Sequence, residues 1–465
     1  MEYKELIPQA DNLMESTRSI GYSLKSAIAD IIDNSIAADA HNIKIQFPRA
    51  NHKYLTILDD GMGMNKAMLE IAMVYGSKPV LQARDGKDLG RFGLGLKMAS
   101  LSQCRSLTVV TKQDNLISCA RWDLDFIKEQ KKWMLQIPAP EDLLYIREIE
   151  DLHQLDSGTL VIWEKLDLLL QEANGDYESD VLKRILSDVE SHLSLVFHRY
   201  LEFYERIEQN SVDTNHTPLN ITCNGVKVEG IDPFLSEISY IAFPQEKIQN
   251  TNSEVSIIPW VLPYPDKIPH NMIKKIGDLH QNQGFYIYRN KRLVIYGSWF
   301  YLNNKSELSK LIRVQVDIPN SSQIDKEWKL DVKKSSATLP ERLKKYLRKT
   351  VEKLSIRSKR TFTKRAKLEI SCDGIWIRKE TDTGLITYEI NEQNEYVKKI
   401  IDSNSEIRTL LKIISLTLPY DSIYADRSDG NLVNKNQFEE IEFENLLVNL
   451  SSDLAEKIRG IYYGS

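Results

Sequence analysis

Hydrophobic positions in the first 170 residues follow two spacings in turn. Between residues 22 and 38, apolar side chains recur about every 3.6 positions without an intervening proline, which predicts an amphipathic helix. The short apolar runs at 42–47 and 54–58 predict strands, and 66–75 returns to helical spacing. KMASLSQC predicts a further helix, and SLTVVT and TLVIWE predict strands. The pattern indicates a mixed sheet with helices packed against it.

The second half of the chain follows a different plan. A polar, turn-rich stretch at 171–180 indicates a boundary, followed by a helix at 181–204. Strand-like runs cluster between 220 and 318, which makes this part α+β. Further helices are expected at 304–310, 339–356, 396–416 and 438–458, with strands around IWIRKE and LITYEIN. The expected domains are 1–170, a helical connector at 171–217, an α/β domain at 218–360 and a mostly helical region with some strand at 361–465.

Composition narrows the function classes. The chain has 465 residues, which exceeds the roughly 250 to 300 residues that one hydrophobic core supports, so several domains are expected. A net charge of -5 excludes a uniformly basic coat or an acidic tail. No apolar run reaches the roughly 18 residues of a membrane span, and the first residues do not resemble a signal peptide. We therefore expect a cytoplasmic protein that does not contact a membrane.

The segment ADIIDNS places a carboxylate and an amide on one helix face. Asp30 and Asn34 are four residues apart, so their side chains lie about 5 to 6 Å from each other. A carboxylate can polarise water, and an amide oxygen can ligate a hard cation such as Mg²⁺. The alternative is a solvated polar face.

Two further segments place polar groups beside strands. Asp59 ends a strand and opens the sequence DDGMGM, in which Gly61 and Gly63 allow a flat ring to approach closely. An aspartate in this position can accept a hydrogen bond from an exocyclic amine. The segment lacks the distal glutamate of an EF-hand, although a plain hairpin loop would look similar. Thr159 begins the strand LVIWE, where its hydroxyl could bind a base or a neighbouring strand.

A glycine-rich segment, GRFGLGLK, precedes a predicted helix. Glycines before a helix present backbone N–H groups and the positive end of the helix dipole to an anion, and Lys97 adds a charge. The spacing is neither that of the Walker A loop nor that of the Rossmann fingerprint.

Together these segments resemble the GHKL ATPase superfamily, which includes gyrase, MutL and MORC proteins, and most closely its bacterial MORC-like members. An acid four residues before Asn34, the DxGxG that begins at Asp59, a GxxGxG lid and a late Gly-Thr occur in the family's order. The resemblance covers residues 16 to 165 and implies an α/β sandwich that binds ATP and Mg²⁺.

The resemblance also implies roles for individual residues. Asp59 would hold the adenine amine with support from Thr159, and Asn34 would ligate Mg²⁺. The lid would close over the triphosphate, and Gly76-Ser77-Lys78 resembles a motif near the phosphates in MORC-like members. The expected ATP-binding residues are Asn34, Asp59, Gly61, Gly63, Met64, Ser77, Lys78, Gly90, Arg91, Phe92, Gly93, Leu94, Gly95, Leu96, Lys97 and Thr159.

Asp30 stands where hydrolysing members of the superfamily have a glutamate as general base. Because aspartate is one methylene shorter, we expect either a shifted attacking water or slow hydrolysis. The region 218–360 resembles the transducer domain of gyrase, MutL and MORC relatives, in which a lysine reaches the γ-phosphate. QGFYIYRNKRLVIYGSW is similar to a MORC hairpin, and Lys333 or Lys334 is favoured over Lys326 for the catalytic lysine. A histidine kinase is disfavoured because only about 20 residues precede the first motif.

Residues 342–367 hold twelve Lys or Arg and one acid. Such a density can contact several DNA phosphates without sequence preference, and the alternative is an amphipathic helix with a solvated basic face. The resemblance implies a homodimer that forms on ATP binding and acts as a DNA-associated clamp in a bacterial antiviral defence or DNA-manipulation system. Its effector would be a separate helicase or nuclease, since no nuclease motif is evident. The alternative is a chaperone-like scaffold that uses ATP as a switch and contacts proteins only.

Overall fold

The computed structural model describes residues 3–4, 8–75, 95–201, 217–321, 324, 327–328, 338–366, 376–380, 386–403 and 411, with short gaps at 20, 51, 174, 177–178, 251–252 and 308. The chain divides into two compact units, which are described separately. The first comprises residues 1–305 and 309–358, and the second comprises residues 306–308 and 359–465.

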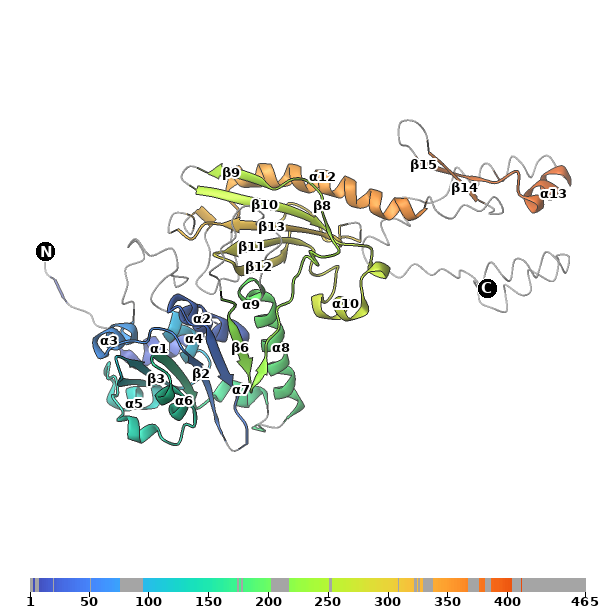
Figure 1. The fold of residues 1–465 in the computed structure, drawn as a ribbon. Coiled ribbons are helices and arrows are strands. Elements are labelled where there is room, and N and C mark those ends of the chain that lie inside the picture. Colours follow the sequence, from blue (N-terminus) through green and yellow to red (C-terminus); the bar gives the residue numbers. More distant parts are fainter. Residues whose placement is uncertain are drawn as a thin grey trace. The chain divides into compact units, whose positions relative to one another are not determined.

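The first unit begins with a seven-stranded sheet in the order β4-β3-β5-β2-β1-β6-β7 (Figure 1). Neighbouring strands are antiparallel except β1 and β6, which run parallel. The strands are β1 (Asn42–Gln46), β2 (Tyr54–Asp59), β3 (Ser106–Gln113), β4 (Leu116–Asp123), β5 (Gly158–Glu164), β6 (Asn220–Cys223) and β7 (Val226–Lys227).

Strands β6 and β7 lie beyond the domain boundary expected at residue 218, yet they extend the first sheet. Asn42 of β1 is the register partner of Asn220 of β6, so this pairing joins segments 178 residues apart. Local hydrophobic spacing contains no signal for such a pairing, which is why the sequence placed these strands with the following domain.

Alternation along β2 separates two hydrophobic cores. Leu55 and Ile57 pack with most of the helices, whereas Tyr54 and Leu58 pack on the opposite face with η1 and α6. Since successive strand residues point to opposite faces, Asp59 shares the helix-covered face with Ile57. The first face is covered by α1 (Ala10–Arg18), α2 (Leu24–Ala37), α3 (Lys66–Met73), α4 (Gly95–Leu101), α5 (Leu124–Gln130), α7 (Asp167–Glu172), α8 (Asp180–Val196) and α9 (His198–Leu201), and the second by η1 (Pro140–Leu143) and α6 (Glu148–Gln154).

Most predicted helices are confirmed, and two differ. Ser23 caps α2 by accepting a hydrogen bond from the Ser26 N–H, so the helix begins where the apolar spacing begins. The single helix expected at 181–204 is broken at Phe197, which separates α8 from α9. The helix expected at 304–310 is wrong for the described residues, which form turns between two strands. Its polar residues follow no helical apolar stripe that packing could stabilise.

A second sheet follows, with strand order β12-β11-β13-β10-β8 and β9 paired to β10. β11 and β13 run parallel, and the other pairs are antiparallel. The tight turn between β11 and β12 holds Asn290 and Lys291 at positive φ, a conformation typical of two-residue hairpins. The elements here are β8 (Tyr240–Ile241), β9 (Glu246–Asn250), β10 (Ser253–Val261), η2 (Pro265–Lys267), α10 (His270–Ile276), β11 (Gly284–Arg289), β12 (Arg292–Ser298) and β13 (Ile312–Ile318).

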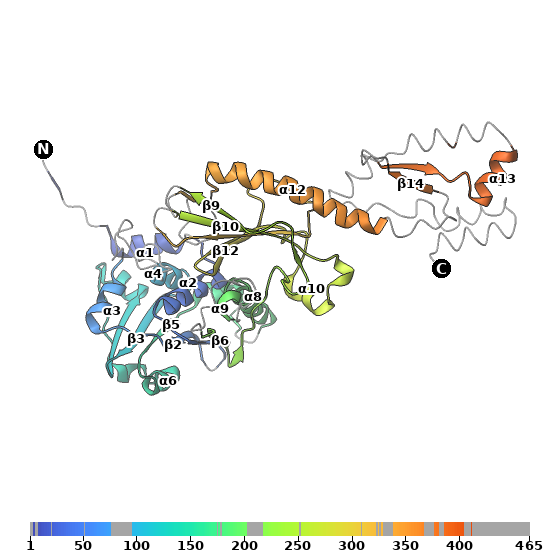
Figure 2. The ribbon, with the colours of Figure 1, turned by 45° about the horizontal axis from the view of Figure 1, so that its top comes forward.

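The basic segment forms α12 (Glu341–Ala366), which lies along β9 and β10 in both ribbon views (Figures 1 and 2). Its predicted apolar stripe is confirmed as a packing face, because four residues spaced along the helix are buried. Lys345, Arg348 and Lys349 on the same helix are exposed. The buried residues are Leu343, Leu347, Val351 and Leu354.

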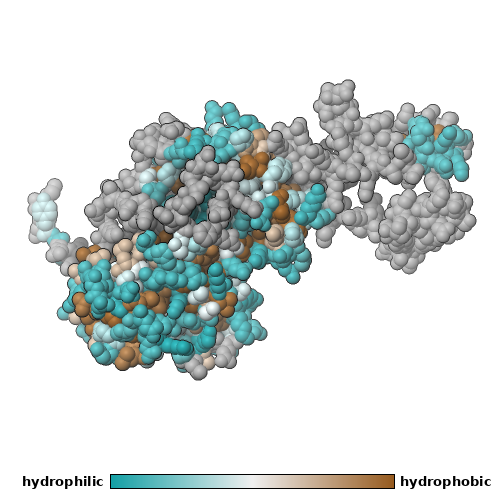
Figure 3. Space-filling model, viewed as in Figure 1, coloured by the Kyte–Doolittle hydropathy of each residue, from teal (hydrophilic) through white to brown (hydrophobic). Residues whose placement is uncertain are grey.

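The second unit contains an antiparallel hairpin and a helix. β14 (Trp376–Glu380) pairs with β15 (Ile386–Ile390), and α13 (Glu395–Ser403) follows. The helix expected at 438–458 lies outside the described residues. On the face of the molecule in Figure 3, hydrophilic and apolar patches alternate over the described surface. Within the described parts of the chain, no helix combines the length and hydropathy needed to traverse a bilayer.

Candidate nucleotide site

Asp59 lies almost fully buried between β2 and α2, with only neutral hydrogen-bond donors around it. Its exposed fraction is 5%. Ser35 Oγ donates to Oδ2 at 2.7 Å, while the Gly61 and Thr159 N–H groups donate to Oδ1 at 3.0 and 3.2 Å. Burial raises the pKa of this carboxyl to about 6, against the opposing effect of the three donors. A carboxylate offers about four acceptor positions, so Oδ2 retains room for one more donor.

The loop after Asp59 is held on several sides by hydrogen bonds. Ser157 Oγ donates to the Gly61 carbonyl at 2.7 Å, and the Met64 N–H donates to Thr111 Oγ1 at 2.9 Å. Gly63 has a φ of +64°, and a Cβ there would lie 2.0 Å from the Lys112 carbonyl oxygen. Only glycine fits this position. The glycine and the two hydrogen bonds together fix the loop next to Asp59.

Thr159 lies half-buried at the start of β5, where it contacts both Asp59 and β3. Its Oγ1 lies 3.3 Å from Thr111 Oγ1, and Thr111 Oγ1 in turn donates to the Gly158 carbonyl at 3.0 Å. A Cβ at Gly158 would lie 2.3 Å from the Asp59 carbonyl oxygen. The Gly-Thr pair therefore sits directly beside Asp59, as the motif order implies.

Asp30 and Asn34 lie on α2 but differ in exposure. Asp30 is 6% exposed and accepts a hydrogen bond from the Tyr22 hydroxyl at 3.1 Å, whereas Asn34 is exposed. Within the described residues, no group of three or more His, Cys, Asp or Glu side chains could hold a metal ion by itself. One exposed amide oxygen fits Mg²⁺, because this ion keeps several waters and takes its other ligands from substrate phosphates.

Lys97 does not project outward. Its Nζ donates to the Ala72 carbonyl at 2.6 Å, its exposed fraction is 2%, and burial lowers its pKa to about 8. We expected Lys97 to present its charge to an anion. In this conformation its side chain is directed toward α3 instead. Gly95 has open space at its Cβ position, and Leu96 packs partly against the core.

Part of the expected site lies outside the described residues. This applies to most of the glycine-rich lid, to the motif upstream of it and to the candidate transducer lysines. The residues concerned are Gly76, Ser77, Lys78, Gly90, Arg91, Phe92, Gly93, Leu94, Lys326, Lys333 and Lys334.

The β11–β12 hairpin contacts the helix that carries Asp30 and Asn34. Arg292 Nε, at the start of β12, donates to Asp33 Oδ1 at 3.0 Å, and both side chains are buried. The Arg292 guanidinium also lies 4.3 Å from the centre of the Phe197 ring. The Tyr200 hydroxyl donates to the Asn290 carbonyl at the hairpin tip. These contacts hold the second sheet against α2 and α9.

Sequence reasoning missed the residues that support the site from neighbouring elements. Ser35, Thr111 and Ser157 each hold Asp59 or its loop, and Arg292 pairs with Asp33. Alternation along β3 could have placed Thr111 on the same face of the sheet as Asp59. The partner of Asp33, in contrast, lies 259 residues away. No local pattern links those two residues.

Comparisons with known proteins match the segment that contains these residues. Residues 22–159 match the family described as histidine kinase-, DNA gyrase B-, and HSP90-like ATPase. The chain is 33% identical over 120 residues to ATPase morc-1 of Caenorhabditis elegans, which covers 25% of this chain and 14% of that protein. It is 26% identical over 193 residues to human ATPase MORC2, covering 34% of this chain and 18% of that protein.

A third relative, human MORC family CW-type zinc finger protein 1, is 29% identical over 131 residues, covering 27% of this chain and 13% of that protein. The chain thus spans less than a fifth of the length of these relatives. The matched segment contains α2, the Asp59 loop and the beginning of β5, which are the elements that build the site. Residues 22–159 therefore form a domain of the GHKL type, and the relatives that share this segment include MORC ATPases.

Proposed function

We propose that the chain binds ATP with Mg²⁺ between α2 and the first sheet and hydrolyses it. The observation that carries the proposal is Asp59, a buried carboxylate with three neutral donors and an acceptor position left for an exocyclic amine. No cation among the described residues pairs with it, so it remains a strong acceptor for adenine. The relatives named ATPase support the same activity.

In this proposal, residues of α2 carry the chemistry. Asp30 accepts a proton from the attacking water, and the Tyr22 hydroxyl fixes the orientation of its carboxylate. Asn34 holds Mg²⁺, which supplies charge neutralisation for the phosphates. Burial of Asp30 restricts its motion, and positioning is the main contribution that a protein makes to phosphoryl transfer.

Asp30→Asn tests the hydrolysis step. The variant should bind ATP with nearly unchanged affinity but release phosphate at least 100-fold more slowly, because the amide cannot accept the proton. Binding is measured by calorimetry and turnover by phosphate release. Tyr22→Phe is the matched control, and it should lose less activity than Asp30→Asn since the base itself is kept. An unchanged steady-state rate in Asp30→Asn would exclude Asp30 as the base.

We further propose that ATP binding drives homodimerisation and that the second sheet acts as a transducer. The support is the buried Asp33–Arg292 pair, which connects the second sheet to the helix of the candidate base. A non-hydrolysable ATP analogue should double the mass measured by light scattering. An equal mass with and without the analogue would contradict dimerisation on ATP binding.

A contact with DNA is supported by one observation, the exposed basic face of α12. Lys345, Arg348 and Lys349 are exposed while the apolar stripe of the same helix is buried. We propose sequence-independent binding of duplex DNA as a clamp, with a helicase or nuclease as effector in a defence or DNA-manipulation system. Reversing the three charges should abolish a salt-sensitive mobility shift. If the shift persists unchanged in that variant, α12 is not the DNA contact, and if the wild type shows no shift at all, the chaperone-like scaffold that contacts proteins only is favoured.

A further inference from the structure

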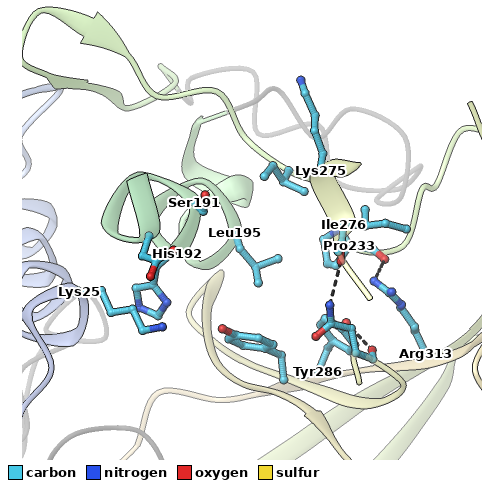
Figure 4. Close-up of a pocket in the computed structure, with 14 residues that line it drawn as sticks. Lys25, Ser191, His192, Leu195, Pro233, Lys275, Ile276, Tyr286 and Arg313 are labelled. Carbon is cyan, nitrogen blue, oxygen red and sulfur yellow. Dashed lines mark hydrogen bonds between the residues drawn. The ribbon is translucent and has the colours of Figure 1, made fainter. Parts of the chain in front are cut away.

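A cavity of about 280 Å³ lies where α8 faces the second sheet (Figure 4). Ser191, His192 and Leu195 line it from α8, and Tyr286 and Arg313 line it from β11 and β13. It has no lining residue in common with the Asp59 site. A ligand here would therefore be separate from the nucleotide.

Arg313 is a buried cation without a counter-ion. It is 1% exposed, and its Nη1 donates to the Pro233 carbonyl. Among the residues that the structure describes, its Nε and Nη2 have no hydrogen-bond partner and no carboxylate forms an ion pair with it. The guanidinium lies 5.4 Å from the centre of the Tyr286 ring, which offers a weaker contact than an anion would. A charge left unpaired in the interior is costly, so this site is incomplete without a further partner.

His192 lines the cavity beside α2 and is buried enough to stay neutral. Burial, followed by the charges of Arg292 and Lys25, lowers the pKa of His192 to about 3, with Asp33 opposing. The imidazole is therefore neutral, and its buried Nδ1 has no hydrogen-bond partner. Lys25 is drawn beside His192 in Figure 4.

The other charged groups at the cavity do not neutralise Arg313. Asp188 lines the cavity from α8 but is exposed to solvent. Lys275 forms an ion pair with Glu229 at 3.2 Å, and Figure 4 shows its side chain directed away from the labelled cluster.

We propose that this cavity binds a small oxyanion, bearing a phosphate or carboxylate group, as the counter-ion of Arg313. Nε and Nη2 lie on one edge of the guanidinium, where two parallel N–H groups match two oxygens of such an anion; both atoms are covered in this structure, so binding requires a small movement of the side chain. Leu195 and Ile276 line the cavity with apolar surface that suits a short carbon skeleton. The volume admits only a small ligand, since cavities for drug-sized molecules range from about 300 to 1,000 Å³.

Inorganic phosphate is the probe for this site, compared with chloride at equal ionic strength. Phosphate should raise the melting temperature of the full chain by about 2 °C at ten times its Kd. It should also shift the imidazole resonances of His192 in histidine-labelled protein, with assignment by His192→Gln. The second readout is local, so phosphate bound at the nucleotide site does not produce it.

Variants decide whether Arg313 is responsible. Arg313→Gln should weaken phosphate binding at least tenfold, and Lys25→Ala, at an exposed position that folding tolerates, should weaken it severalfold. Lys275→Ala is the matched control and should bind like the wild type, because Lys275 is already paired. The proposal is overturned if phosphate leaves His192 unchanged in the wild type. It is equally overturned if both Arg313→Gln and Lys25→Ala respond like the wild type.

Discussion

Two buried aspartates in the first unit, Asp59 and Asp33, have opposite surroundings. Asp59 is 5% exposed and is held by a hydroxyl and two backbone N–H groups, whereas Asp33 is 1% exposed and is paired with the Arg292 guanidinium. Neutral donors fix the direction of a carboxylate without cancelling its charge, so Asp59 remains available to a ligand. A cation cancels the charge, so Asp33 serves to hold the second sheet against α2.

The contrast assigns the two aspartates different tasks: Asp59 is free to bind a ligand, and Asp33 holds the second sheet. Ser35 of α2 contacts Asp59, and Asp33 of the same helix contacts the β11–β12 hairpin. α2 therefore touches both the candidate adenine site and the second sheet. Any shift of the hairpin that moves Asp33 will also move Asp30 and Asn34, because all three lie within about one turn of the helix.

Removing the cation from the connecting site should have the largest effect on stability. Arg292→Met leaves Asp33 buried without its charge partner and should lower the free energy of unfolding by about 3–5 kcal/mol. Asp33→Asn combined with Arg292→Met should recover most of this loss, since neither charge then remains. Chemical denaturation measures both variants. Lys291→Met, on the same hairpin turn, is the control and should change stability little.

If the double variant is as unstable as Arg292→Met, the loss came from packing against Phe197 rather than from the ion pair. Asp33 and Asp59 would then differ in how their neighbours pack and not in whether their charge is neutralised.

Removing the buried cation Lys97 should raise the stability of the fold, whereas removing Arg292 should lower it. Lys97 has its pKa lowered to about 8 by burial, so its charge destabilises the nucleotide-free fold. Lys97→Met should raise the free energy of unfolding at pH 7 by about 1–3 kcal/mol. Because the pKa is lowered in the folded state, the wild type should gain stability as pH rises from 8 toward 10. The variant should lack that gain, and thermal unfolding across this range shows the difference.

Lys97→Met should at the same time weaken ATP binding if Lys97 leaves Ala72 for the phosphates. Unchanged ATP affinity together with higher stability would remove Lys97 from the list of ligands and leave it a purely structural residue.

The pH dependence of nucleotide binding should be the smallest effect. With a pKa of about 6, Asp59 is mostly ionised at pH 7 and mostly protonated at pH 5, so adenine-nucleotide affinity should fall about tenfold over this range. Its raised pKa has the opposite effect on the nucleotide-free protein, whose stability gains from Asp59 protonation as pH falls from 6 toward 4. ADP and ATP share the adenine amine and should show the same fall. An Asp59→Asn variant with the same pH dependence would assign the effect to another group.

Sequence patterns predicted the elements that carry the candidate site where its residues are contiguous. The helix with Asp30 and Asn34, the strand ending at Asp59 and the Gly-Thr pair at β5 all occur in the structure, because spacing and alternation are local properties. The orientation of Lys97 was not predictable in this way. Its position on the helix was clear, but which face of a short helix turns inward depends on the elements that pack against it, and the acceptor for Lys97 lies on α3.

Long-range pairing was also beyond the reach of the sequence. The parallel contact between β1 and β6 and the ion pair between Asp33 and Arg292 join residues that are 178 and 259 positions apart. The local sequence around a strand residue or a hairpin arginine does not indicate which distant element it will contact.

By itself, the sequence determined the order of motifs and thereby the superfamily of the N-terminal domain, because each motif is a short run with its own geometry. The tertiary structure decided which charges are neutralised. Among the described residues, Asp59 has no cationic partner, Asp33 pairs with Arg292, and Arg313 lines a cavity without a counter-ion. The physical reason is that burial and charge pairing depend on which distant segments pack together, and the free energy of a buried charge is set by those neighbours.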